Sequence, residues 1–366
     1  MSKLKYRIAY YAVLHFLTDF LCAAFVTGTL VQNGADLYTV LIYNLCAFAL
    51  QFVVGALFDV CGISSGGAVA AFFVLTASFV LKDIPYAAAA AAGIGNSLFH
   101  VGAGRDILLR DRKNCTPLGL FICPGAVGIF LGVIAGNGHL ISLWVLGILA
   151  AAGAFFAWQV YRQSPAPAGG NEPAAGGASA PSAAAVPASD SSSAAVPFSG
   201  FRPAAVLIPL LCLLAVVILR SYMGAHQDFA WKKTVSDSAC VLAAVVLGKA
   251  FGGILADRIG KKAFSVISLA AAAVFFAFSG LEIFGLAAVF LFNMTMPVTM
   301  RGAAEWLPGR EGTSFGFLSF GLFLGMFLDR YLLGGISPFA GFSILASLLS
   351  AVLLIIGLKK ENGAAL

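Results

Sequence analysis

The amino-acid sequence predicts an all-α membrane protein of twelve transmembrane helices in two six-helix bundles, with both termini in the cytoplasm. Hydrophobic residues make up 60% of the 366 residues and charged residues only 10%. That is too little polar surface to cover a soluble globule of this size, so lipid must be the main solvent. A Gly-x-Leu-x-Asp-x-x-Gly motif also occurs once in each half of the chain, at Gly55 and at Gly253. Together these observations indicate a duplicated membrane bundle.

The apolar stretches place the predicted helices. A bilayer core takes about 20 apolar residues per helix, and in the first half we expect spans at 7–31, 37–58, 66–82, 85–104, 117–136 and 139–161. In the second half we expect 203–226, 235–256, 263–280, 283–300, 313–334 and 337–358. Residues 164–200 are rich in Ala, Pro, Gly and Ser and predict a disordered linker. The predicted domains are therefore 1–163, 164–200 and 201–366.

The basic residues predict the orientation. Lys and Arg in short loops are held in the cytoplasm, and here they cluster before the first span, after the fourth, eighth and tenth spans, and at the C-terminus. All these places lie on one side of the predicted bundle. We therefore interpret the formal net charge of +6 as a topology signal and expect no nucleic-acid partner.

The repeated motif predicts a gate on the cytoplasmic side. In the second copy, Asp257 ends one helix, Gly260 permits the turn into the next, and Arg258 follows as a base. A short charged loop of this kind can cap a neighbouring helix and hold a bundle interface shut. The first copy keeps Asp59 but lacks the following bases, and we assign Arg105, at the end of the fourth span, to the same gate.

The first span carries an ionisable pair. His15 and Asp19 are four residues apart and share one helix face. Asp19 lies roughly 18 Å along the helix from Arg7, near the middle of the bilayer. A carboxylate at that depth must face a cavity, pair with a base or take up a proton. We expect Asp19 and His15 to exchange protons, while a buried pair that only fixes helix packing is the alternative.

Polar residues also mark the fourth, seventh, tenth and eleventh spans. Asn96 and His100 form a stripe within a Gly-rich run, and Asn293 lies close to Pro297. Arg220 and Asp329 lie at comparable depths in the outer half. Arg220 therefore either binds an anionic substrate, pairs with Asp329 in an outer gate, or snorkels to the interface. We expect His100, Asn96, Arg220 and Asn293 to contact substrate and Asp329 to act in gating.

The repeated Gly-Asp-Gly motif resembles the cytoplasmic signature of the major facilitator superfamily. His15 to Asp19, the Gly-Asn-Ser-Leu-Phe-His run at 95–100 and Arg220-Ser221 resemble, more narrowly, its fosmidomycin-resistance branch, although Val101 stands where we expect a proline. The resemblance implies alternating access by two halves and proton-coupled export of a small organic molecule, with anionic and antibiotic-like compounds as candidates. It further implies a monomer in a bacterial inner membrane.

Two rival functions remain at this stage. One is proton-coupled uptake of a small metabolite by the same fold, and the other is a membrane scaffold or lipid-handling protein without transport. No span pairs a nucleophile with a base and no loop holds a phosphate-binding Gly-Lys motif, so we expect neither an enzyme nor an ATP-driven pump. The seven cysteines show no metal spacing, and we expect no metal and no cofactor other than the proton gradient.

Overall fold

The computed structural model describes residues 2–163, 203–227, 229–334 and 341–359, and these residues contain helices and no strand. The predicted linker, 164–200, lies outside the described residues. The first half of the chain forms α1 (Ser2–Phe25), η1 (Val26–Val31), α2 (Leu37–Asn44), η2 (Leu45–Ala49), α3 (Leu50–Cys61), α4 (Ser65–Val80), α5 (Pro85–Arg110), α6 (Thr116–Asn137) and α7 (Leu143–Arg162), where η marks a π-helical turn.

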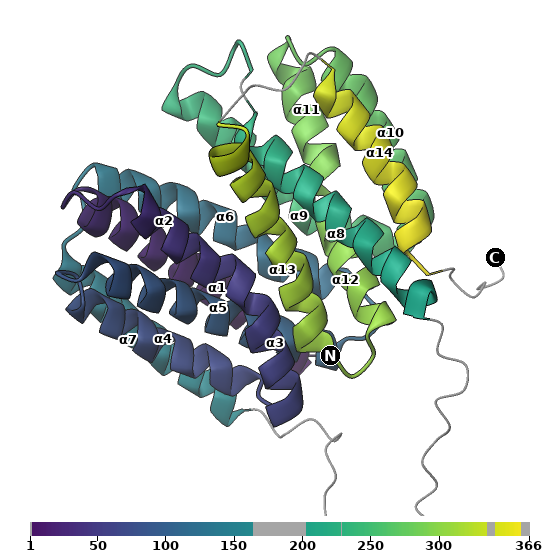
Figure 1. The fold of residues 1–366 in the computed structure, drawn as a ribbon. Helices are drawn as coiled ribbons and strands as arrows, with labels where there is room; N and C mark the ends of the chain where they lie inside the picture. The colour runs from purple at the N-terminus through teal and green to yellow at the C-terminus, as the bar shows by residue number, and fades with distance from the viewer. Residues whose placement is uncertain (1, 164–202, 228, 335–340, 360–366) are drawn as a thin grey trace, which may run out of the picture.

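The second half repeats this pattern. Its elements are α8 (Pro203–Ala225), α9 (Val235–Ile259), α10 (Lys261–Ala277), α11 (Glu282–Asn293), α12 (Met296–Trp306), α13 (Glu311–Phe327), η3 (Leu328–Leu332) and α14 (Phe342–Gly357). Figure 1 shows the two groups of helices side by side, purple to teal for the first and green to yellow for the second. Each predicted span overlaps a helix or consecutive helical segments, and residues 337–340 of the last predicted span lie outside the described residues.

Eight helical stretches are long and apolar enough to cross a membrane by length and composition. Among the described residues these are Leu4–Val31, Leu37–Cys61, Thr116–Asn137, Leu143–Arg162, Ala205–Ala225, Val235–Ile259, Glu282–Trp306 and Glu311–Leu332. The apolar helices α4 and α14 are shorter. The chain is therefore a multi-pass membrane protein, and its regular structure within the described residues is helical.

Local sequence signals explain where several helices begin and end. Pro85 and Pro117 stand in the first turns of α5 and α6, where the missing N–H costs nothing. Thr234 and Asp237 form a reciprocal capping box at the start of α9. Gly62, at a φ of +68°, ends α3 in the left-handed conformation that glycine adopts without strain.

The two halves meet mainly where α13 crosses α3 and where α6 crosses α9. Glycines permit both crossings. A Cβ on Gly316 would lie 2.0 Å from the carbonyl oxygen of Gln51, and one on Gly253 would lie 2.7 Å from that of Cys115. A Cβ on Gly55 would likewise lie 2.1 Å from the carbonyl oxygen of Gly312. The glycine that opens each copy of the motif, Gly55 or Gly253, is thus a point of backbone contact between the halves.

Candidate functional site

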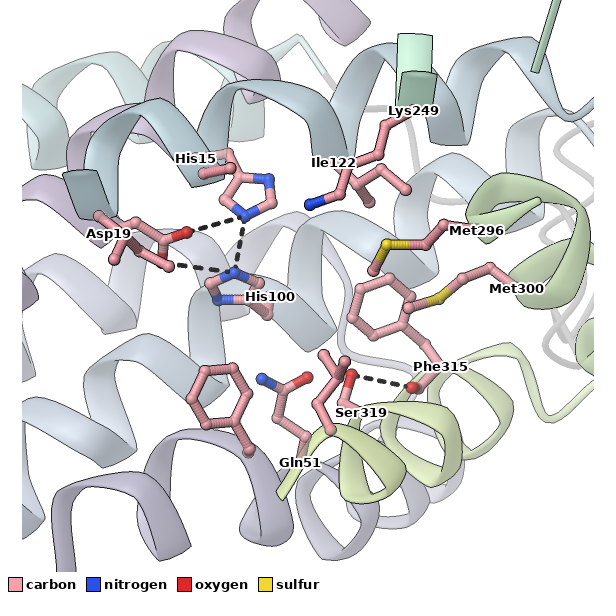
Figure 2. A pocket seen from close by; sticks show the side chains of 14 residues that line it. His15, Asp19, Gln51, His100, Ile122, Lys249, Met296, Met300, Phe315 and Ser319 are labelled. Atoms are coloured by element: carbon pink, nitrogen blue, oxygen red, sulfur yellow. Dashed lines mark hydrogen bonds and ion pairs between the residues drawn. The ribbon is translucent and has the colours of Figure 1, made fainter. Parts of the chain in front are cut away.

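A cavity lies between the two halves and encloses about 550 Å³ of empty space, part of it open to solvent. The first half contributes residues from α1, η2, α3, α5 and α6, and the second half contributes residues from α9, α12 and α13. Its lining consists of His15, Asp19, Phe48, Gln51, His100, Ile122, Ala126, Ile129, Lys249, Met296, Met300, Phe315, Ser319 and Leu322. Figure 2 shows the ionisable side chains of both halves pointing into this one space.

His15, Asp19 and His100 form a buried cluster at the wall of the cavity. Nε2 of His15 lies 3.3 Å from Oδ2 of Asp19, and Nε2 of His100 lies 3.6 Å from Oδ1 of the same carboxylate. The two Nε2 atoms are 2.8 Å apart (Figure 2). Spacing of four residues on α1 puts His15 and Asp19 on one face, and α5 brings His100 against them. The sequence therefore identified all three, but only packing of α1 against α5 unites them.

The contacts of the two imidazole rings indicate which ring nitrogens carry hydrogen. Nδ1 of His15 lies 2.7 Å from the carbonyl oxygen of Phe121, and Nδ1 of His100 lies 2.9 Å from that of Asn96. A carbonyl oxygen only accepts, so both Nδ1 atoms carry hydrogen. In neutral rings both Nε2 atoms would then present lone pairs to each other at 2.8 Å. One proton shared between the two Nε2 atoms would remove this repulsion and would make the pair cationic beside the Asp19 carboxylate.

Neighbouring residues hold Asp19 in place. Asn96 donates from Nδ2 to Oδ1 of Asp19 over 3.0 Å and is itself buried. Gly125 on α6 provides the space for the cluster, because a Cβ there would lie 2.3 Å from Nε2 of His15 and 2.5 Å from Oδ2 of Asp19. The expected stripe of Asn96 and His100 thus divides into two tasks, with His100 lining the cavity and Asn96 orienting the carboxylate.

The same three side chains have the composition of a divalent metal site, since one ligand atom from each lies within 4.8 Å of the others. Two nitrogens bound to one tetrahedral zinc ion, at about 2.0–2.1 Å each, lie about 3.3 Å apart. The Nε2 atoms here are 2.8 Å apart, the length of a hydrogen bond between nitrogens. The geometry therefore fits a shared proton better than a metal ion.

Arg220 and Asn293 lie outside the lining of this cavity. Arg220 is buried and donates from one terminal nitrogen to Oγ1 of Thr295 over 2.6 Å. Its guanidinium also lies over the ring of Phe292, 5.7 Å from the centroid. Asn293 donates to the carbonyl oxygen of Val289 within α11. Contact of these two residues with substrate stays a prediction, because neither lines the cavity in this conformation.

The pairing of Arg220 with Asp329, one of the three alternatives considered for Arg220, is not seen among the described residues. Oδ1 of Asp329 lies 2.7 Å from Nε2 of His226 instead. His226 follows α8, and the sequence analysis did not single it out. Arg220 and His226 lie about a turn and a half apart on or just beyond the same helix. Depth along the helix therefore could not show which of these two bases pairs with Asp329.

Two aspartates join the halves at the end that carries the basic loops, which we call the basic end. Asp257 accepts hydrogen bonds from the backbone N–H groups of Cys115 and Thr116 and from the Thr116 hydroxyl, at the start of α6. Asp59 accepts the equivalent set from Gly312 and Thr313, at the start of α13. Each carboxylate thus satisfies free N–H groups at a helix N-terminus of the opposite half.

The basic residues near these aspartates differ in the contacts that they make. Arg105 donates from Nε to Asp59 over 2.8 Å and also contacts Ser64, so it supports the Asp59 cap from within its own half. Arg258 is exposed, and its side chain forms no hydrogen bond or ion pair within the described residues. Arg301 instead bridges the halves by donating to the carbonyl oxygens of Asp111 and Asn114. The contacts between the halves thus involve Asp257 and not Arg258, and a gating role for Arg258 stays a prediction.

The opposite end of the interface is looser. There the described residues contribute a 3.4 Å hydrogen bond between the halves, from Oη of Tyr331 to the carbonyl oxygen of Leu37. The basic end, in contrast, carries both aspartate caps, Arg301 and an ion pair of Arg112 with Glu311 at 3.7 Å. The structure is thus closed at the basic end.

No protein-family model matches the sequence, and no curated protein is significantly similar to it in sequence. Solved structures share its fold. The E. coli fucose:proton symporter FucP matches with a TM-score of 0.63 at 13% identity, over 95% of this chain and 96% of that chain. A second structure, FucP as a major facilitator superfamily transporter in the outward conformation, gives 0.64 at 14% identity over 97% of each chain. A bacterial homologue of the iron transporter ferroportin, outward-facing, gives 0.59 at 14% identity, covering 95% of this chain and 98% of that chain.

The chain has the major facilitator fold. Lys249 on α9 is an ionisable lining residue that was not predicted from the sequence. A lone lysine inside the apolar run 241–256 was the available signal. A base that deep in a span requires a cavity or a partner. Gln51, Met296, Met300 and Ser319 also line the cavity without a sequence signal that separates them from ordinary packing residues.

Proposed function

We propose that this protein is a proton-coupled secondary active transporter of small organic molecules, working by alternating access. In this proposal twelve helices cross the membrane as two six-helix bundles, both termini are cytoplasmic, and a monomer acts in a bacterial inner membrane. Asp19, His15 and His100 exchange the proton. Membership of the fosmidomycin-resistance-like branch belongs to the proposal as well.

The observation that carries the proposal is the buried cluster of His15, Asp19 and His100 at the wall of a cavity between the halves. Groups of this kind are costly in a membrane unless they serve an aqueous pathway or a proton relay. The cluster has one site for a proton that two rings share, and the cavity supplies the route by which that proton arrives and leaves. A scaffold protein would gain nothing from placing these groups beside empty space.

The two aspartate caps provide the gate that alternating access requires. They close the basic end by hydrogen bonds that cross between the halves, and these bonds can break and reform without rearrangement inside either half. Asp59 and Asp257, with Arg105 in support of Asp59, are therefore proposed as the cytoplasmic gate. In the same proposal, His226 and Asp329 stabilise the opposite end of the second half.

The direction of transport is open in this geometry. Export by antiport, the cycle implied by the family resemblance, and uptake by symport both need one protonatable group that faces the cavity in turn from each side. Both cycles therefore predict that the proton site is essential.

The test is proton movement in proteoliposomes that contain a pH-sensitive dye. Pools of organic acids, amines and sugars are added outside, and we expect at least one class to move protons through the wild-type protein. Asp19→Asn removes the charge but keeps the shape, and we expect it to abolish that proton movement while the protein stays folded. A proton flux that is unchanged in Asp19→Asn would refute the proposal.

A further inference from the structure

Lys249 places a cation in the cavity without a partner. Its ammonium forms no hydrogen bond or ion pair within the described residues, and it lines the same cavity as His15, Asp19 and His100 (Figure 2). It lies eight residues before Asp257, about 12 Å along α9 and thus within the span. An ammonium at that depth needs an anionic or strongly polar partner.

Few titratable groups surround the ammonium of Lys249. The titratable groups that face it are Asp19, His15 and His100 across the cavity, Cys123 on α6 and Arg220 on α8. Cys123 is a half-buried neutral thiol, and Arg220 is buried outside the lining. The charge of the cavity itself therefore depends on Asp19, the histidine pair and Lys249.

Protonation of the cluster changes the net charge of this cavity. With one proton shared by His15 and His100, the cationic pair neutralises Asp19, and Lys249 is left as one unbalanced positive charge. Without that proton both histidines are neutral, and Lys249 balances Asp19. The proton-loaded cavity thus carries one positive charge more than the proton-free cavity, because the nearby Arg220 adds the same charge in both states. An anion from outside therefore binds more favourably to the proton-loaded form.

From this we propose that the cavity binds a small organic monocarboxylate against Lys249, and that the carboxylate and the proton bind cooperatively. The inference rests on the proposed function and selects between its two cycles. Antiport requires that proton and substrate compete for the protein, whereas symport requires that each favours the other. Cooperative binding therefore makes the protein a proton and monocarboxylate symporter.

The rest of the lining fits the body of such a substrate. Ile122, Ile129, Leu322 and the thioethers of Met296 and Met300 offer apolar surface, while Gln51 and Ser319 offer polar atoms. Ligand sites commonly combine an apolar wall with a few polar groups that fix orientation. A carboxylate with a short apolar chain matches this division, with its charged end at Lys249 and its chain toward the methionines.

The experiment measures binding of butyrate to the purified full-length protein in detergent, by calorimetry between pH 5 and pH 8. Butylammonium and butyramide serve as cationic and neutral probes of the same size. We expect butyrate to bind at least fivefold more tightly at the acid end of the range, a typical size for coupling between two sites. We also expect uptake of about one proton per butyrate near the midpoint, and no binding of butylammonium.

Variants separate the role of Lys249 from general charge effects. Lys249→Met should abolish butyrate binding and the linked proton uptake, and Lys249→Arg should restore part of both. Lys113→Met, which removes an exposed charge from the loop before α6, should bind butyrate as the wild type does. If Lys249→Met fails to fold, the pH dependence in the wild type still decides the question.

Two outcomes overturn the inference without touching the proposed function. In the first, butyrate binds more tightly at alkaline pH, and in the second it does not bind at all. If amines or neutral compounds still drive proton flux in proteoliposomes, the protein is a proton-coupled transporter without the proposed carboxylate site. Conversely, cooperative butyrate binding in a protein that moves no protons with any compound would defeat the transport proposal and leave the binding site standing.

Discussion

Asp59 and Asp257 each cap the first turn of a helix that belongs to the other half of the protein. Asp59 receives the N–H groups of Gly312 and Thr313, and Asp257 receives those of Cys115 and Thr116. The two caps are thus related by the internal repeat of the chain. Neither cap can persist when the halves separate at the basic end, so each carboxylate contributes to one conformation only.

Removing the Asp257 cap should therefore open the basic end more often. Burial raises the pKa of the Cys115 thiol, which keeps it unreactive while the halves are together. We expect Asp257→Ala to increase maleimide labelling of Cys115 about tenfold, as losing about 1.4 kcal/mol of hydrogen bonding to a charged group implies. The measurement uses a variant that keeps Cys115 as its only cysteine. Asp83→Ala, at an exposed ion pair, is the control, and equal labelling rates would contradict a gating role for Asp257.

Loss of Asp59 should cost more stability than loss of Asp257. Asp59 also neutralises Arg105, whose buried guanidinium would be left without its carboxylate. Removing one partner of a buried ion pair typically costs about 3–5 kcal/mol. We expect a clearly lower Tm in detergent for Asp59→Asn than for Asp257→Asn. The double variant Asp59→Asn/Arg105→Gln should recover part of the loss, and a Tm with no recovery would argue against this pair as the cause.

The proton cluster should be sensitive to a single methyl group. In Gly125→Ala the new Cβ would lie within 2.5 Å of both His15 and Asp19, so the cluster must open. We expect proton flux to fall as in Asp19→Asn, although no ionisable residue has changed. Gly147→Ala provides a matched control, because nothing lies within 4 Å of a Cβ there. Wild-type flux in Gly125→Ala would show that the observed arrangement is dispensable.

The buried ion pair of Arg7 with Asp106 should affect the stability of the protein but not the coupling between proton and butyrate binding. Asp106 accepts from Arg7 over 2.8 Å, from Tyr11 over 3.1 Å and from Arg110 over 3.0 Å, which ties α1 to α5. Because Asp106 does not line the cavity, Asp106→Asn should lower the free energy of unfolding by about 3–5 kcal/mol and leave the pH dependence of butyrate binding unchanged. Thermal unfolding and calorimetry on one preparation test both parts. A changed pH dependence would place Asp106 in the proton pathway.

The sequence predicted the placement of most helices and several site residues, but not their partners. His15, Asp19 and His100 stood out because an ionisable residue in an apolar run is rare and costly. Arg220 and Asn293 stood out as polar residues in apolar runs, yet they pack within the second half and do not line the cavity. Depth along a helix can be calculated from the sequence, whereas the direction in which a side chain points depends on how neighbouring helices are rotated.

The sequence by itself determined that this chain is an all-helical membrane protein with a repeated aspartate motif, because hydropathy and spacing are local properties. Only the tertiary structure decided that His15 and His100, from different helices, face each other across 2.8 Å and that Lys249 lines the same cavity as these histidines. It also decided that Asp329 contacts His226. These are contacts between residues far apart in the chain. They follow from the packing of whole helices, to which both the close approach of glycine-bearing backbones and the polar residues contribute.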